Sequence, residues 1–161
     1  MSRLLRITCL MLLAIMPLSA QGIPEPADYF GFEIGEDRKL ADWEQLTGWY
    51  ELLAARSDRV ILDTLGETTW GLPYIMLTVT SSDNHARLDE LREIQMKLAD
   101  PRLISGPEEL SNLLDQGKTV AMVTAGIHAT EVGGPMMNAR MVPILMTVKI
   151  FWTIFPKTTP T

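Results

Sequence analysis

The feature that most constrains the fold is a near-continuous apolar run at residues 118–125, with the sequence KTVAMVTA. Such a run predicts a β-strand that is buried on both of its faces. A strand of this kind lies at the centre of a sheet, with helices covering the sheet on both sides. We therefore expect an α/β architecture with a parallel centre around this segment.

The segments before this run alternate between helical and strand periodicity. Apolar residues spaced three and four apart predict amphipathic helices, and two β-branched runs joined by a loop with Gly and Pro predict an antiparallel hairpin. In chain order the sequence predicts a helix at 37–56, strands at 59–65 and 74–80, a helix at 83–99 and a short helix that stops at Gly117. The fold class that follows is α/β, a mixed and mostly parallel sheet flanked by helices, with the hairpin at its edge.

The first twenty residues have the pattern of a signal peptide. Arg3 and Arg6 precede an apolar stretch over residues 7–18, and small residues follow up to Ala20. The apolar stretch is short for a bilayer-spanning helix, which favours cleavage after Ala20 over an uncleaved anchor. We therefore expect a secreted or periplasmic protein with no stable membrane span after cleavage. The chain's single Cys lies inside this segment, which suits an oxidising compartment.

The charge of the chain narrows the range of partners. Its 14 basic and 20 acidic residues give a formal net charge of −6. Binding along a nucleic acid needs a footprint of Lys and Arg that neutralises phosphates. The sequence therefore excludes nucleic acid as an expected partner.

The loop after the apolar run contains the candidate chemistry. His128 and Glu131 are three residues apart at the carboxyl end of the predicted strand, where open α/β sheets bind ligands. An imidazole nitrogen and a carboxylate are suitable ligands for Zn²⁺. On this pattern alone a structural alternative stays open. In it His128 ends the strand, and Glu131 occupies the first turn of the next helix, where the helix dipole favours an acid.

The sequence TVAMVTAGIHATEVGG, residues 119–134, resembles the first metal motif of the zinc carboxypeptidases, the carboxypeptidase A-like metallopeptidases. In that family a buried strand ends in a Gly-Ile-His-x-x-Glu segment that supplies two of three zinc ligands. The segment DTLGETTWGLPYIMLTVTS is similar to the family's opening hairpin, with Gly71-Leu72 in place of the usual Gly-Arg pair. The resemblance covers residues 29–140, the N-terminal part of such an enzyme.

The resemblance implies a carboxypeptidase-like fold and a zinc-dependent exopeptidase that acts on the C-termini of peptides or proteins. It assigns His128 and Glu131 as the first and second zinc ligands. In the family, zinc polarises the scissile carbonyl and a water, and a distant Glu takes the proton. Arg side chains bind the substrate's terminal carboxylate. Thr130 stands where the family often has a substrate-binding Arg.

The family's third zinc ligand and general base have no counterpart in this chain. No His follows His128, and Glu131 is the last acidic residue. The other His, His85, is expected on the surface of the second long helix. We therefore interpret the chain as an incomplete and inactive part of a metallocarboxypeptidase.

The composition of the chain changes after residue 140. Residues 141–161 contain no acid and include Pro143, which is expected to break the helix that follows Gly134. The predicted domains are a signal peptide at 1–20, the N-terminal part of a zinc carboxypeptidase-like domain at 21–140 and a divergent apolar tail at 141–161. The tail is interpreted as a product of truncation and a changed reading frame, with a buried strand and an interfacial segment as alternatives.

Two other functions stay open at this point. A secreted binding module without catalysis would keep the α/β shell and would need no third ligand. A zinc-dependent deacylase or amidohydrolase of small acyl-amino acids would use a similar motif.

Overall fold

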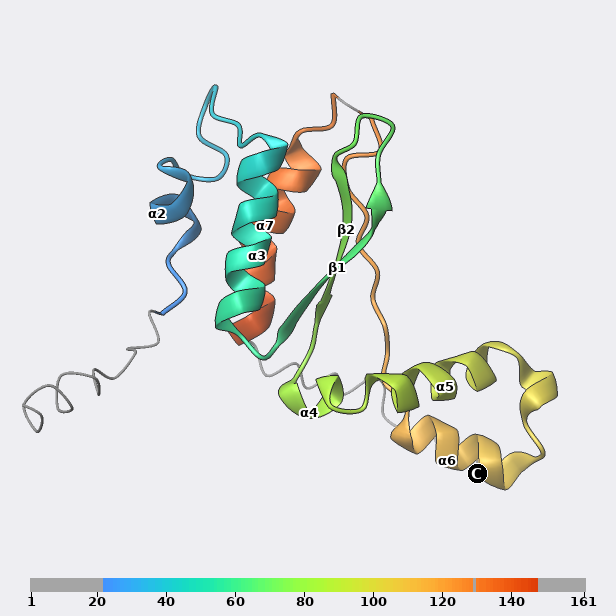
Figure 1. Cartoon of the computed structure of the whole chain (residues 1–161). Helices are drawn as coiled ribbons and strands as arrows, with labels where there is room; N and C mark the ends of the chain where they lie inside the picture. Colours follow the sequence, from blue (N-terminus) through green and yellow to red (C-terminus); the bar gives the residue numbers. More distant parts are fainter. Residues whose placement is uncertain (1–21, 129, 148–161) are drawn as a thin grey trace, which may run out of the picture.

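Two helices lie side by side and pack against one face of a β-hairpin in the computed structural model, which describes residues 22–128 and 130–147 (Figure 1). Residues 82–116, which are mostly helical, project from one end of this body as an arm (Figure 1). The elements are α2 (Pro26–Phe30), α3 (Trp43–Arg56), β1 (Val60–Glu67), β2 (Pro73–Val79), α4 (Ser82–His85), α5 (Leu88–Ala99), η1 (Pro101–Leu103), α6 (Pro107–Gln116) and α7 (Gly133–Thr147). The predicted signal peptide at 1–20 lies outside the described residues.

Helix α3 begins at Trp43, six residues later than its apolar spacing predicts. Asp42 causes this start, because its carboxylate accepts a hydrogen bond from the Gln45 N–H at 2.8 Å. The Gln45 side chain in turn accepts from the Asp42 N–H at 3.1 Å. This reciprocal capping box satisfies two N–H groups that would otherwise have no partner at the helix end.

The predicted antiparallel hairpin is confirmed. Strands β1 and β2 pair Val60 with Val79 and Leu62 with Leu77, and a bulge lies between Thr64 and Gly66. Since side chains alternate along a strand, these pairs share one face, and that face packs against the helices. The opposite face contains exposed apolar side chains, including Tyr74 and Met76.

The mixed α/β class is confirmed, but the expected parallel centre is not formed in the described part of the chain. The sheet there has two antiparallel strands. Residues 118–125 are extended without being a strand, and every one of them is exposed. Figure 1 shows this segment running from α6 back along the hairpin to α7. A strand needs backbone partners, and no backbone hydrogen bond joins residues 118–125 to β1 or β2.

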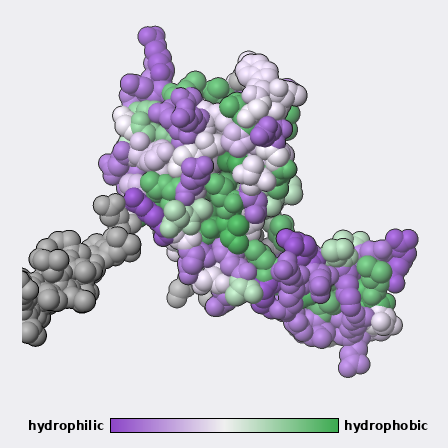
Figure 2. Space-filling view, viewed as in Figure 1, coloured by the Kyte–Doolittle hydropathy of each residue, from purple (hydrophilic) through white to green (hydrophobic). Residues whose placement is uncertain are grey.

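Apolar surface gathers over the middle of the main body, where the hairpin and α3 lie, whereas the projecting arm is mostly hydrophilic (Figure 2). In the arm, α5 and α6 pack against each other as an antiparallel pair. Leu91 and Ile94 of α5 are buried, whereas α6 has no buried residue. The helix predicted at 83–99 is divided into α4 and α5. Within the described ranges, no helix combines the length and the apolar character that crossing a membrane requires.

The expectation that Pro143 breaks the helix is wrong, because α7 runs through it to Thr147. A proline inside a helix has no N–H, so the carbonyl four residues earlier loses its donor. That carbonyl belongs to Ala139, and the Trp49 indole N–H donates to it at 2.9 Å. Both residues have no exposed surface. Trp49 of α3 therefore supplies the hydrogen bond that Pro143 removes.

Residues 141–147 extend the core as part of α7. Val142 and Met146 are buried there with Trp49 and Leu53. The division of the chain at residue 140 stays a prediction, and residues 148–161 lie outside the described ranges.

Replacing Trp49 tests its hydrogen bond to α7. We expect Trp49→Phe to lower the free energy of unfolding by about 1–3 kcal/mol more than Trp43→Phe, because it leaves the buried Ala139 carbonyl without a donor. Trp43 is the matched control, since its indole N–H is buried and has no hydrogen-bond partner in the described structure. Urea unfolding followed by circular dichroism measures both values. Equal losses for the two variants would contradict the role given to Trp49.

Candidate metal centre

The chain reaches the candidate site through an extended segment that is held at its two ends. At the start, the Gly117 N–H donates to the Leu113 carbonyl at 2.8 Å and the Gln95 side chain donates to the Lys118 carbonyl. At the end, Ala125 and Gly126 pack against the first turn of α7. The positions of these ends, and not strand pairing, therefore direct the chain towards His128.

The packing at the start of α7 depends on the absence of a side chain at Gly134. A Cβ atom placed there would lie 3.0 Å from the Ala125 Cβ, which is closer than an ordinary van der Waals contact. Gly126 adopts φ +78°, a left-handed conformation that favours glycine, and lies beside the Pro135 ring. These glycines let the loop before His128 lie directly on the helix that follows Glu131.

His128 and Glu131 come together in a tight turn. The Glu131 N–H donates to the His128 carbonyl at 3.0 Å, which closes the turn. The side chains also meet, because His128 Nδ1 lies 2.7 Å from Glu131 Oε1. Since an ionised carboxylate only accepts, Nδ1 is assigned as the protonated nitrogen in this hydrogen bond. The structure therefore brings together the two residues that the sequence singled out.

Both side chains are open to solvent. The exposed fractions are 72% for the His128 side chain and 54% for the Glu131 side chain. Nδ1 and Oε1 face each other across their hydrogen bond, and one nitrogen and one oxygen fit the ligand preference of Zn²⁺ once the imidazole nitrogen has lost its proton. Tetrahedral coordination at ordinary zinc distances separates two such donor atoms by about 3.3 Å, so the pair would open slightly around an ion.

The described residues bring no third protein ligand to this turn. They contain no group of three or more His, Cys, Asp or Glu placed to hold a metal ion. His85 is half-buried instead of lying on the surface as expected. Its Nδ1 lies 2.6 Å from the Asp58 carbonyl and is assigned as the donor, which fixes the ring to the loop before β1. His85 is thus engaged in packing and hydrogen bonding away from the turn.

A comparison with known protein families identifies the family to which this chain belongs. Residues 46–149 match the zinc carboxypeptidase family, a span of more than half of the chain. The chain belongs to the zinc carboxypeptidase family. No curated protein and no solved structure gives a significant match.

The matched span of this family member runs from within α3 through α7. It includes the turn with His128 and Glu131 as well as Trp49 and Pro143. The resemblance inferred from residues 119–134 is thereby confirmed at the level of the family. Members of this family are metallocarboxypeptidases, and their characteristic metal is zinc.

Two residues support the site through contacts that the metal motif itself does not reveal. Gly134 is visible in the sequence as part of a Gly-Gly pair, but which of the two contacts the loop depends on the tertiary packing. Trp49 lies far from the motif along the chain, and its contact with Ala139 joins residues 90 positions apart. The signal that could have indicated it is Pro143, since an internal proline leaves a carbonyl that needs another donor.

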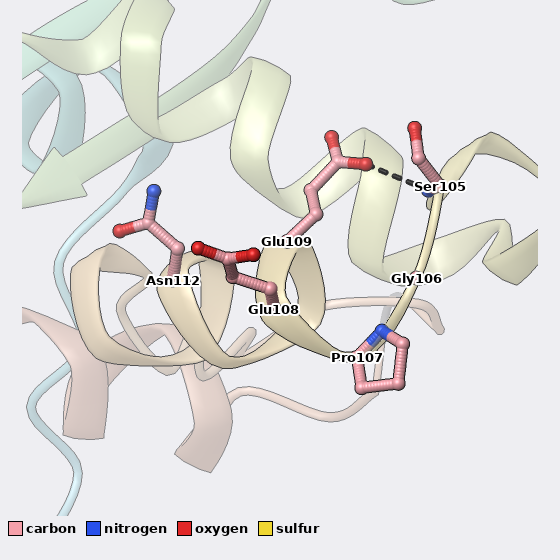
Figure 3. A pocket seen from close by; sticks show the side chains of 6 residues that line it. All are labelled: Ser105, Gly106, Pro107, Glu108, Glu109 and Asn112. Atoms are coloured by element: carbon pink, nitrogen blue, oxygen red, sulfur yellow. Dashed lines mark hydrogen bonds between the residues drawn. The ribbon is translucent and has the colours of Figure 1, made fainter.

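A separate hollow of about 620 Å³ lies at the start of α6 (Figure 3). Its lining comprises Ser105, Gly106, Pro107, Glu108, Glu109 and Asn112. Glu109 accepts hydrogen bonds from Lys97 and from the Ser105 N–H, each at 2.7 Å. The hydrogen bond from Lys97 is the main cause that lowers the pKa of Glu109 to about 2. This carboxylate fastens α6 to α5.

Adding a methyl group at Gly134 tests the close packing beneath the site. We expect Gly134→Ala to lower the free energy of unfolding by about 1–3 kcal/mol relative to Gly133→Ala, because only the former presses on Ala125. Gly133 is the matched control, since a Cβ there would meet nothing within 4 Å. Thermal unfolding compares the two variants. A Gly134→Ala protein at least as stable as Gly133→Ala would show that the loop does not lie on α7 as described.

Proposed function

We propose that His128 and Glu131 bind Zn²⁺ as the first two ligands of a metallocarboxypeptidase centre. The reaction class is hydrolysis of the C-terminal peptide bond of peptides or proteins. The observation that carries this proposal is the 2.7 Å approach of His128 Nδ1 to Glu131 Oε1 inside the span matched to the zinc carboxypeptidase family. One nitrogen and one oxygen ligand that are both open to solvent supply two of the protein ligands that a zinc site uses.

In this role the residues around the turn position the two ligands. The backbone hydrogen bond from Glu131 to His128 keeps the imidazole and the carboxylate on the same side of the chain. The contact between Gly134 and Ala125 holds the turn against α7. When bound, zinc supplies Lewis acidity to a peptide carbonyl and lowers the pKa of a bound water.

We propose further that the 161-residue chain by itself does not catalyse this reaction. Catalytic zinc sites use three protein ligands and keep one position for water. After Glu131 the sequence contains neither a further His nor a further acid that could serve as a ligand or general base. A metal ion, a general base and a carboxylate-binding Arg act as a unit in this reaction. The loss of one of them therefore removes most of the rate of peptide hydrolysis.

The same shortage of ligands favours a second candidate function. A secreted module that binds peptides without cleaving them would need only the exposed turn and the surrounding apolar surface. It differs from the first candidate in one measurable respect, because removing zinc would leave its binding of peptides unchanged.

Zinc binding to the purified chain tests the ligand assignment. We expect weak binding, and we expect His128→Ala or Glu131→Ala to reduce the affinity at least about tenfold, since even groups that only orient ligands change metal affinity by about 10–100-fold. Isothermal titration calorimetry with ZnCl₂ measures the dissociation constants.

The control variants for zinc binding are His85→Gln and Glu108→Gln, which change the same residue types elsewhere in the chain. We expect both to bind zinc as the unmodified protein does. If His85→Gln abolished binding while His128→Ala left it intact, the ligand assignment would be wrong.

An activity assay tests the proposal that the chain alone is inactive. We expect no release of C-terminal amino acids from a panel of peptides with aromatic, aliphatic and basic termini, with or without added Zn²⁺, because the sequence after Glu131 supplies neither a third zinc ligand nor a general base. Mass spectrometry of the peptides gives the readout. Cleavage that a chelator stops and that His128→Ala removes would overturn the proposal of inactivity while supporting the zinc site.

We also propose that residues 1–20 direct export to the periplasm or the outside of the cell. The basic residues before a short apolar stretch, and the small residues up to Ala20, support this. The expected result is an exported protein whose N-terminal residue is Gln21, determined by N-terminal sequencing of the extracellular or periplasmic fraction. Exported, soluble protein that begins at Met1 would contradict cleavage.

A further inference from the structure

A second hollow, of about 440 Å³, is formed by the start of α7 and the loop that joins α2 to α3. Residues 35–40 of the loop line one side, and Val132, Gly133 and Met136 line the other. The loop and the start of α7 lie at the same end of the main body (Figure 1). Since Val132 follows Glu131 directly, the hollow begins one residue after the candidate metal turn. Its volume is within the range of about 300–1,000 Å³ that is usual for small-molecule sites.

The loop that lines this hollow is held in place by its own hydrogen bonds and by one contact with α7. The Glu36 N–H donates to the Glu33 carbonyl at 2.9 Å, and the Lys39 N–H donates to the Glu36 carbonyl at 3.2 Å. The Ala41 N–H donates to the Met136 sulfur at 3.4 Å, which fixes the end of the loop to α7. The two sides of the hollow are therefore in place without a ligand, and this lowers the entropic cost of binding one.

The loop side of the hollow contains two acids and two bases in a row, at residues 36–39. Asp37 Oδ2 lies 3.6 Å from Arg38 Nε, which is longer than a hydrogen bond between charged groups, and the two side chains are 93% and 91% exposed. Lys39 forms no ion pair with any residue that the structure describes. These side chains can therefore turn to a ligand, and their balanced charges favour one that has both a positive and a negative group.

Apolar side chains form the remainder of the hollow. Met136 is buried, whereas Leu40 is 57% and Val132 is 45% exposed. Gly133 adds no side chain, and a Cβ atom placed there would meet nothing within 4 Å. An apolar group that covers Leu40 and Val132 removes their surface from water, which is favourable. The hollow thus combines charges of both signs with an apolar surface.

We propose that this hollow binds a small zwitterion with an aliphatic side chain, namely a free amino acid such as leucine. Its carboxylate contacts the charged ends of Arg38 and Lys39, and its ammonium group contacts the Asp37 carboxylate. The long ion pair between Asp37 and Arg38 is thereby replaced by charge-assisted hydrogen bonds to the ligand. Because the ligand is small and the charges are exposed, the affinity is expected in roughly the millimolar range. None of these contacts involves His128 or Glu131, so the site does not depend on the proposed zinc centre.

A set of ligands that each lack one group of leucine tests the proposal. N-acetyl-leucine has no ammonium group, leucinamide has no carboxylate, and glycine has no aliphatic side chain. We expect leucine to bind at least about tenfold more tightly than each of the others, because each has lost one type of contact. Nuclear magnetic resonance titration of the ¹⁵N-labelled full chain, dialysed against a chelator beforehand, measures the dissociation constants. We expect the shifted amides to be those of residues 35–40 and of the start of α7.

Charge-removing variants test the two polar contacts. We expect Arg38→Gln and Asp37→Asn each to weaken the binding of leucine at least about tenfold, since each removes a charged partner of the ligand. The matched controls are Arg92→Gln and Asp89→Asn, because Asp89 and Arg92 form an exposed ion pair in the arm. We expect both controls to bind leucine as the unmodified chain does.

A variant that fills the hollow tests its location. We expect Gly133→Leu to abolish the binding of leucine, because the added side chain occupies the open space beside Val132. Circular dichroism checks that this variant keeps the helical content of the unmodified chain.

Three results would overturn the proposal. The first is no binding of leucine up to about 50 mM, well above the expected range. The second is shifted amides that lie away from the hollow. The third is equal affinity for leucine and for either N-acetyl-leucine or leucinamide, which would show that the hollow recognises a single charge. Because the titration contains no metal, a failure of the zinc proposal leaves all of these results unchanged.

Discussion

The hydrogen bond from the Trp49 indole to the Ala139 carbonyl is the interaction on which the rest of the structure depends. It joins α3 to α7 across the core, at two residues with no exposed surface. Its importance follows from Pro143, which cannot donate to Ala139 and would otherwise leave a buried carbonyl unsatisfied. With the indole as substitute donor, α7 continues through the proline. Val142 and Met146 are then buried with the side chains of α3.

The position of α7 in turn decides where the candidate metal ligands lie. The first turn of this helix contains Gly134, against which Ala125 packs without space for a side chain. The chain between them forms the turn that brings His128 Nδ1 and Glu131 Oε1 within 2.7 Å. A residue of α3 thus influences a site formed more than 70 residues later in the chain, through the placement of one helix. This influence acts through packing, since none of the hydrogen bonds in the described part of the chain joins Trp49 to the turn.

Local patterns predicted the parts of the fold that local interactions stabilise. The hairpin followed from two β-branched runs and a turn, and the metal motif was recognised from residues that are close in sequence. The predictions that failed concern features that depend on residues far away in the sequence. Residues 118–125 have the composition of a central strand, but strand formation needs neighbours that the described chain does not place there. Pro143 was expected to end a helix, because sequence alone does not show that Trp49 lies beside Ala139. The start of α3 could have been predicted, since Asp42 and Gln45 have the spacing of a capping box.

A double-mutant cycle shows whether Trp49 compensates for the donor missing at Pro143. The cycle measures how much Trp49→Phe lowers the free energy of unfolding, first in the unmodified protein and then in a Pro143→Ala background. Urea titrations give the free energies. In that background the backbone N–H at position 143 can donate to the Ala139 carbonyl. We expect Trp49→Phe to be less destabilising there by about 1–2 kcal/mol, because the carbonyl is no longer left unsatisfied. An equal loss of stability in both backgrounds would show instead that the indole acts only by filling space and does not replace the missing donor.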